Sequence, residues 1–359
     1  MKRKFLILLV LFALSANAAA LERPDMEFKV FQFPSNMIPR IDGDTSDWDI
    51  VGDDYTIGTD QLSDTQKGQG TNIDTADIDV NVRVGWVKGL NRLYFLYEAY
   101  DEFWDFEENV RPVDIFEIVV DGDLSGGPLI KQMNPNADLV SVEELHFLFH
   151  GVHAQNYHIF TPPGNKDWNF VWGAAQYTKD LPFANHAYSY DFKQGESGNL
   201  ILEFWITAFD YSPYDAPDKA VQSDFYENKL IGLSWSVLDY DGPTDYEGFY
   251  NLSHKTTMYG DASDLCAFRL MPVEKQFLKT IDAKWTYKVV DMDSRTVAFK
   301  DNSYGNITKW HWDFGDGTTS AEQNPIYRFK EGGEKIVVLT IEGPEGTSEF
   351  CRLRDIVLK

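Results

Sequence analysis

The chain has 359 residues, of which 43% are hydrophobic and 15% aromatic, and this composition indicates a folded rather than a disordered protein. Its formal net charge of -25 would repel nucleic acid and anionic membranes, which excludes partners of those two classes. The charge is compatible with neutral glycans and with bound cations, particularly calcium, which prefers carboxylate and carbonyl oxygens.

The first twenty residues have the pattern of a secretory signal peptide. Basic residues Lys2 to Lys4 precede an apolar run over 5–14, and Ala16-Asn17-Ala18 is a small-x-small cleavage site. The run is too short to span a bilayer, and no second apolar stretch of membrane length follows. Cleavage would remove three basic residues and no acid, which changes the net charge from -25 to -28. We therefore expect a mature chain that is secreted, periplasmic or on the cell surface, without membrane insertion.

Strand patterns dominate residues 28–275. Ile78 to Trp86 alternates apolar and polar side chains with a period of two, and Arg92 to Tyr100 is apolar on both faces, as in a central strand of a sandwich. Further strands are expected over 114–121, 142–150, 157–160, 168–177, 200–207, 230–239 and 265–270, separated by Gly, Pro, Asn and Asp clusters. The one helix candidate is the short stretch 216–228. The sequence therefore predicts an all-β domain over 28–275.

A second domain is expected over 282–359, because residues 275–282 form a boundary and a new strand rhythm starts at Trp285. Within it, residues 310–317 read WHWDFGDG, and Gly315-Asp316-Gly317 supplies the residues of a tight turn. Asp313 and Asp316 are interpreted as turn residues rather than as a metal or catalytic pair. Trp312 is expected to point inward and Trp310 outward.

This run closely resembles the PKD (polycystic-kidney-disease) domain. The resemblance implies a small C-terminal immunoglobulin-like β-sandwich that acts as a spacer or a contact surface. His311 departs from the family, which often has a small or apolar residue at that position.

The N-terminal domain carries a series of weak motifs in a fixed order. They are Ile41-Asp42-Gly43-Asp44-Thr45-Ser46-Asp47-Trp48, then 91–95, Asp101, 114–123, 202–206, 231–232 and 239–242. In this order they are similar to family-nine carbohydrate-binding modules and their DOMON-like relatives. The resemblance implies a large, jelly-roll-like β-sandwich that binds a poly- or oligosaccharide without catalysis.

The resemblance also implies a sugar site made of aromatic rings and a few polar side chains, because rings stack on pyranose C–H faces while polar groups fix the hydroxyls. Relatives commonly have an aromatic residue shortly before the strand glutamate that matches Glu117. Arg111 stands there in this chain, and Trp104 is expected to replace the missing ring. The expected sugar contacts are Trp104, Arg111, Glu117, His146, Tyr246, Phe249 and Tyr250. The alternating residues Trp168, Phe170 and Trp172 are the next candidate.

Aspartate clusters predict a structural calcium ion. A D-x-D spacing in an extended turn can aim several oxygens at one hard cation, although solvated turn aspartates would explain each cluster equally well. The candidate ligands are Asp42, Asp44 and Asp47, then Asp121 and Asp123, and finally Asp239 and Asp241.

Cys266 and Cys351 are the only cysteines. In an oxidising compartment the pair could form a disulfide between the two expected domains. The alternative is two buried free thiols.

The pattern leaves three other functions open. A glycosidase or lyase would need two carboxylates about 5 to 10 Å apart, and Asp114, Glu117 and Glu203 are candidates. A DOMON-like haem or redox module would need axial ligands such as Met133, His146 or Met258. A purely structural surface protein would bind no sugar. The sequence best supports a secreted, non-catalytic bacterial protein that binds carbohydrate and assists polysaccharide capture or degradation, with other cell-surface proteins as further partners.

Overall fold

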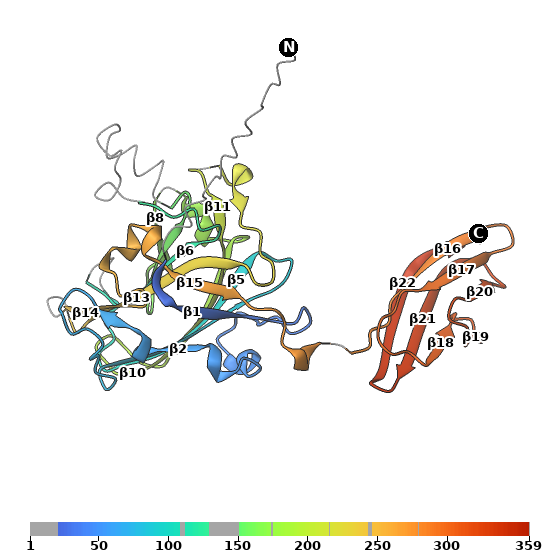
Figure 1. The fold of residues 1–359 in the computed structure, drawn as a ribbon, viewed down its shortest axis with the longest axis horizontal. Coiled ribbons are helices and arrows are strands. Elements are labelled where there is room, and N and C mark those ends of the chain that lie inside the picture. Colours follow the sequence, from blue (N-terminus) through green and yellow to red (C-terminus); the bar gives the residue numbers. More distant parts are fainter. Residues whose placement is uncertain are drawn as a thin grey trace, which may run out of the picture. The chain divides into compact units, whose positions relative to one another are not determined.

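The structure of the protein is a computed structural model that describes residues 21–107, 112–128, 151–173, 175–214, 216–242, 246–278 and 280–358, without the side chains of 353–355. The chain divides into two compact units, Met1–Val273 and Glu274–Lys359 (Figure 1). The described residues form strands and short 3-10 helices and contain no α-helix, which confirms the predicted all-β fold class. No helix in this part of the chain is long and apolar enough to cross a membrane. The expected signal peptide and the strand expected over 142–150 lie outside the described residues.

The first unit consists of fifteen labelled strands with 3-10 helices between them. The strands are β1 (Glu22–Gln32), β2 (Thr56–Gly58), β3 (Ser63–Asp64), β4 (Ile78–Trp86), β5 (Arg92–Asp101), β6 (Ile115–Asp121), β7 (Gln155–Phe160), β8 (Asn169–Trp172), β9 (Ala184–Ser189), β10 (Gly198–Thr207), β11 (Phe209–Tyr211), β12 (Val221–Gln222), β13 (Leu230–Tyr240), β14 (Tyr246–Asn251) and β15 (Cys266–Leu270). The 3-10 helices are η1 (Thr45–Trp48), η2 (Asp53–Tyr55), η3 (Thr59–Gln61), η5 (Gln176–Lys179), η6 (Pro217–Lys219), η7 (Thr256–Tyr259) and η8 (Ala262–Asp264).

Most of these strands belong to one curled sheet with the order β8-β7-β6-β13-β15-β1-β4-β5-β10-β9. Strand β1 pairs in parallel with β15 on one side and with β4 on the other, so it divides the sheet into two halves. The first half consists of β8, β7, β6, β13 and β15, with β14 paired to β13. The second half consists of β4, β5, β10 and β9, with β2 paired to β4. The halves face one another across a shared apolar core, in which Tyr97 of β5 stacks on Phe116 of β6 with ring centroids 4.3 Å apart. The result is a β-sandwich closed by β1.

Alternation explains which strands were predicted correctly. In β4, the side chains at Ile78, Val80, Val82 and Val84 are buried and those between them are half-buried, as the period of two requires.

Two expectations about secondary structure were wrong. The stretch 216–228 forms η6 and the edge strand β12 rather than an α-helix, because Pro217 fits the first turn of a short helix and no apolar stripe continues it. The strand expected over 168–177 ends at Trp172, and η5 follows.

The second unit is built from two small sheets with the orders β16-β17-β20 and β19-β18-β21-β22. Its strands are β16 (Trp285–Asp291), β17 (Thr296–Asp301), β18 (Lys309–Asp313), β19 (Thr319–Ser320), β20 (Ile326–Arg328), β21 (Gly333–Gly343) and β22 (Gly346–Leu358), and η9 (Lys275–Phe277) precedes them. The unit has its own apolar core, with Trp285, Trp312 and Phe299 in mutual ring contact.

In the WDFGDG turn, Asp313 and Asp316 act as turn residues, as the sequence predicts. Asp313 accepts a hydrogen bond from the N–H of Gly315 at 2.8 Å, and Asp316 accepts from the N–H of Thr318 at 3.1 Å. Trp312 is buried as predicted, but Trp310 does not point outward. It is half-buried against the same core, because residues two apart on a strand share a face.

The proposed cysteine bridge is absent. Cys266 lies in the core of the first unit, where burial raises the pKa of its thiol to about 12, and Cys351 is an exposed thiol of the second unit. A disulfide requires the two sulfurs to be about 2 Å apart, and both cysteines are free thiols in the structure. The alternative prediction of two buried free thiols is therefore correct for Cys266 and wrong for Cys351, whose thiol is exposed.

Candidate functional site

The face of the first half that points away from the core carries polar and aromatic side chains in register. Ser236 of β13 lies opposite Glu117 of β6, Glu117 opposite His158 of β7, and His158 opposite Phe170 of β8. A second line across the same strands runs through Ser234, Val119, Asn156 and Trp172. Directly opposed residues share a face. We call the polar and ring-bearing members of both lines the outer-face row: Ser234, Ser236, Glu117, Asn156, His158, Phe170 and Trp172.

His158 is the centre of this row. Its Nδ1 atom lies 3.3 Å from Oε2 of Glu117, and its ring meets the edge of Trp172 at 5.7 Å. The rings of Phe170 and Trp172 are perpendicular at 5.0 Å, and both side chains are half-buried. The row therefore combines a buried acid–imidazole pair with two partly accessible rings on the edge strand β8.

Several buried polar atoms of the row have no hydrogen-bond partner among the described residues. They are Nε2 of His158, Oδ1 of Asn156 and Oγ of Ser234. The amide nitrogen of Asn156 does donate, to the carbonyl oxygen of Tyr259 at 2.9 Å. Buried polar groups in folded proteins are nearly always hydrogen-bonded, so unpartnered atoms in one place indicate a bound water or ligand.

The structure contradicts three of the expected sugar contacts. Trp104 is 1% exposed, because its ring stacks on Phe192 at 5.0 Å and its indole N–H donates to the carbonyl oxygen of Gly198. Phe249 and Tyr250 are also buried, since they lie in strand β14 beside β13 and not in a loop. As placed, these three rings cannot stack on a sugar.

The other expected contacts fall in different places. Glu117 belongs to the outer-face row, and Tyr246 packs half-buried against the apolar cluster of the same face. Arg111 and His146 lie outside the described residues. Trp168 is buried in the core against His186, so it does not share a face with Phe170 and Trp172, although the spacing suggested it.

The first predicted calcium cluster is a set of turn residues. Asp42 accepts from the N–H of Asp44, Asp44 caps helix η1 by accepting from the N–H of Ser46, and Asp47 accepts from the N–H of Arg40. Two groups of at least three acidic, His or Cys side chains have ligand atoms within 4.8 Å of one another in the described ranges, and neither includes these three aspartates. Each of the three aspartates thus has a backbone donor, and a metal site at this cluster stays a prediction.

The segment 41–48, which contains this cluster, is hydrogen-bonded to Glu203. The carboxylate of Glu203 accepts from the N–H groups of Asp42 and Gly43 and from the indole of Trp48. Burial raises the pKa of Glu203, while these donors act against that shift. Its role is to anchor the entry segment rather than to supply a catalytic acid.

Asp121 and Asp123 also form a turn. Asp121 accepts from the N–H groups of Ser125 and Gly126, and Asp123 accepts from the N–H of Ser125. No third ligand-bearing side chain joins them in the groups found among the described residues. A calcium site at this pair stays a prediction.

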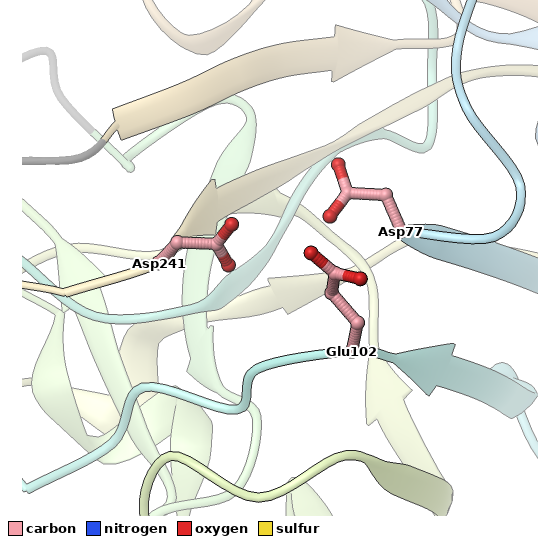
Figure 2. Close-up of side chains that lie close together, drawn as sticks. All are labelled: Asp77, Glu102 and Asp241. Carbon is pink, nitrogen blue, oxygen red and sulfur yellow. The ribbon is translucent and has the colours of Figure 1, made fainter.

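Asp239 and Asp241 belong to two adjoining groups of carboxylates. The inner triad is Asp101, Asp114 and Asp239, and the outer triad is Asp77, Glu102 and Asp241. In each triad, one carboxylate oxygen from each residue lies within 4.8 Å of those of the other two. Figure 2 shows the carboxyl groups of the outer triad pointing toward one another from three separate segments.

Both triads join the two halves of the sheet. Asp101 ends β5 of the second half, whereas Asp114 precedes β6 and Asp239 lies in β13 of the first half. In the outer triad, Asp77 and Glu102 flank β4 and β5, and Asp241 follows β13. The inner triad is buried, and the outer triad is half-buried to exposed.

The environment of these acids opposes their ionisation. Burial, together with neighbouring carboxylates, raises the pKa of Asp239 to about 9 and that of Asp101 to about 7. The pKa of Asp114 is also raised well above its usual range, first by burial and then by the charges of Asp101 and Asp239. At the surface, burial and four neighbouring acids raise the pKa of Asp77 to about 6.

The sequence interpretation missed His158, Asp77 and Glu102 as site residues. His158 carries no motif of its own, and its pairing with Glu117 depends on the register of β6 and β7. The acids did carry a signal, because they stand at the ends of successive strands that meet at one end of a sandwich.

Comparisons with known proteins give two groups of similarity. Residues 285–356 match the family model of the PKD domain, so the second unit is a PKD domain, as predicted. The chain is 33% identical over 161 residues to the pre-pro-metalloprotease PrtV of Vibrio cholerae, which covers 42% of this chain and 15% of that protein. It therefore spans only a small part of the curated relatives it matches.

Among solved structures, the chain is similar to the PKD1 domain of that metalloprotease, with 26% identity over 23% of this chain and 99% of the other, and a TM-score of 0.21. It is also similar to a family 9 carbohydrate-binding module from Caldicellulosiruptor kristjanssonii in complex with cellotriose. That match has 14% identity over 71% of this chain and 98% of the other, with a TM-score of 0.43.

Proposed function

We propose that the first unit is a non-catalytic module that binds a neutral oligo- or polysaccharide at the outer-face row, on a chain that is exported. The observation that carries the proposal is the set of unpartnered buried polar atoms behind the rings of Phe170 and Trp172. A sugar needs both kinds of contact, because its ring C–H groups pack on aromatic faces while its hydroxyls require hydrogen-bond partners.

The acid–imidazole pair suits recognition of a hydroxyl group. If Nδ1–H of His158 donates to Glu117, the Nε2 atom presents a lone pair that accepts a hydroxyl proton, directly or through a water molecule. Glu117 thus fixes the orientation and the tautomer of the imidazole. The net charge of -25 disfavours anionic glycans, so the proposed ligand is neutral.

Binding without chemistry fits the composition of the row. Glu117 is its only carboxylate, whereas glycoside hydrolysis generally uses a pair of them across the scissile bond. The PKD domain then acts as a spacer or contact surface for the binding module, which suits capture of polysaccharide at a bacterial cell surface.

Replacing Trp172 tests the proposal. Trp172→Ala should weaken sugar binding by about 1 to 3 kcal/mol, since that is the usual cost of removing a stacking ring. Isothermal titration of the secreted full chain against a panel of neutral oligosaccharides measures the loss. The matched control is Tyr226→Ala, because Tyr226 is an aromatic residue of the same unit that is 57% exposed outside the row.

Two results would contradict the proposal. One is the absence of binding to every neutral glycan in the panel by a wild-type protein whose thermal unfolding is cooperative. The other is equal sugar affinity in Trp172→Ala, Glu117→Gln and the wild type, which would place the ligand elsewhere.

A further inference from the structure

We propose that the inner triad binds a Ca²⁺ ion, which ties the two halves of the curled sheet together at one end of the sandwich. Asp101 contributes from the second half, and Asp114 and Asp239 contribute from the first. The inference is independent of sugar binding.

The carboxylate oxygens of the inner triad are available for a cation. Both oxygens of Asp239 and Oδ2 of Asp101 are buried and have no hydrogen-bond partner within the described residues. The two side chains are 1% and 0% exposed, so bulk solvent does not reach them. One carboxylate oxygen from each of Asp101, Asp114 and Asp239 lies within 4.8 Å of the other two, and for Asp239 either oxygen is an unpartnered acceptor within the described residues.

Asp114 holds this geometry in place. Its Oδ1 accepts from the N–H of Tyr240 at 2.9 Å, and its Oδ2 accepts from the N–H of Asp105 at 2.6 Å. Each oxygen keeps a second lone pair for a metal. Oδ1 of Asp101 similarly accepts from the N–H of Phe103. Backbone donors therefore orient two of the three carboxylates, while Asp239 is left with no donor.

Charge favours a cation over a vacant cluster. In the described part of the chain, none of the three inner aspartates forms an ion pair with Lys, Arg or His. Like charges buried together without a partner destabilise a fold unless they are protonated or bind a counter-ion. The outer triad, which Figure 2 shows, is more exposed than the inner triad and would concentrate cations near it.

The donor set selects the metal. The three ligands offer oxygen atoms alone, and Ca²⁺ accepts carboxylate oxygens in flexible geometry. Mg²⁺ requires a tighter, near-ideal octahedron, and thiophilic metals prefer Cys or His ligands. The buried hydroxyl of Tyr97 also has no hydrogen-bond partner among the described residues, and, in addition to burial, the same three carboxylates lie close enough to raise its pKa. Tyr97 therefore supplies a nearby chromophore for sensitised terbium luminescence.

The test uses the full mature chain and calcium itself. After chelation, calcium should raise the unfolding temperature of the wild type and should displace Tb³⁺ from a luminescent complex. Asp239→Asn should bind calcium at least about 10-fold more weakly, because it removes a ligand carboxylate. Without calcium, the same variant should unfold at or above the wild-type temperature, since it removes a buried acid whose surroundings oppose its ionisation.

The control is Asp44→Asn, which makes the same chemical change at a helix cap, where Asn also functions. It should keep wild-type calcium affinity. If Asp239→Asn does not fold, Asp101→Asn takes its place with the same readouts. A wild type that shows neither calcium-dependent stabilisation nor bound Tb³⁺ would overturn the inference, as would equal calcium affinity in the triad variant and the control.

Discussion

Trp104 shows how far the neighbourhood of a residue in the sequence can mislead about its burial. It lies between acids in the segment 101–107, which favours an exposed loop, yet its ring is enclosed by Phe192 and by the backbone of Gly198. Trp104→Ala should therefore lower the free energy of unfolding by about 3 to 5 kcal/mol, as expected for truncation of a buried tryptophan. Urea unfolding of the full chain, followed by far-ultraviolet circular dichroism, measures the change.

A conservative variant separates packing from hydrogen bonding at this position. Trp104→Phe keeps a ring against Phe192 but loses the indole donor, so it should cost less than the alanine variant. Unfolding free energies of Trp104→Ala within about 0.5 kcal/mol of the wild type would be typical of a surface residue and would refute the buried placement.

Aspartates with similar spacing in the sequence have different roles in the structure. Asp44 and Asp313 accept hydrogen bonds from backbone N–H groups two residues ahead, so their turns are complete without a metal. Within the part of the chain that the structure describes, Asp239 has no such donor. The D-x-D pattern alone could not make this distinction, because it depends on which N–H groups the fold presents to each carboxylate.

Strand β1 closes the sandwich, although its residues show little of the alternation that predicts a strand. Its first six residues are half-buried or exposed, so they lack the alternation that identified β4. Strand β14 was missed for another reason, since its rings were interpreted as part of a loop after Asp239-Tyr240-Asp241-Gly242. Strand positions in the core could thus be predicted from periodicity, but pairing and register, which create both candidate sites, could not.

The close approach of β1 to β4 requires a glycine. Phe31 pairs with Gly85, and a Cβ atom at Gly85 would lie 2.2 Å from a ring carbon of the buried Phe33. Gly85→Ala should therefore destabilise the first unit by about 1 to 3 kcal/mol through overpacking. Thermal or urea unfolding measures the loss.

The variant Phe33→Leu, which replaces the ring by a smaller side chain, tests whether Gly85→Ala destabilises the unit by overpacking. Overpacking predicts that Gly85→Ala costs less in the Phe33→Leu background than in the wild type, because the ring is no longer in the way. Strictly additive effects in this double-mutant cycle would show that the alanine acts by another route.

At the scale of the whole molecule, each unit buries its own core. The first unit is held by the curled sheet and, in our proposal, by calcium between its two halves. The second unit has a separate set of buried rings, and the two free cysteines do not link the units. The sequence predicts a domain boundary over residues 275–282, and the structure divides the chain into two units between Val273 and Glu274. The independent folding of the second unit can therefore be tested.

We expect Asp282–Lys359 to fold on its own. The fragment contains the apolar cluster around Trp285, Trp312 and Phe299 except for Ile281, and every member of that cluster belongs to the second unit. It should show near-ultraviolet circular dichroism and a single cooperative thermal transition, and Trp312→Ala should remove both because the ring is fully buried. The control Cys351→Ser alters an exposed thiol and should leave the transition unchanged while preventing fragment dimers. A fragment that keeps strand content but lacks fixed aromatic signals and cooperative unfolding would mean that the PKD core is incomplete without the preceding chain.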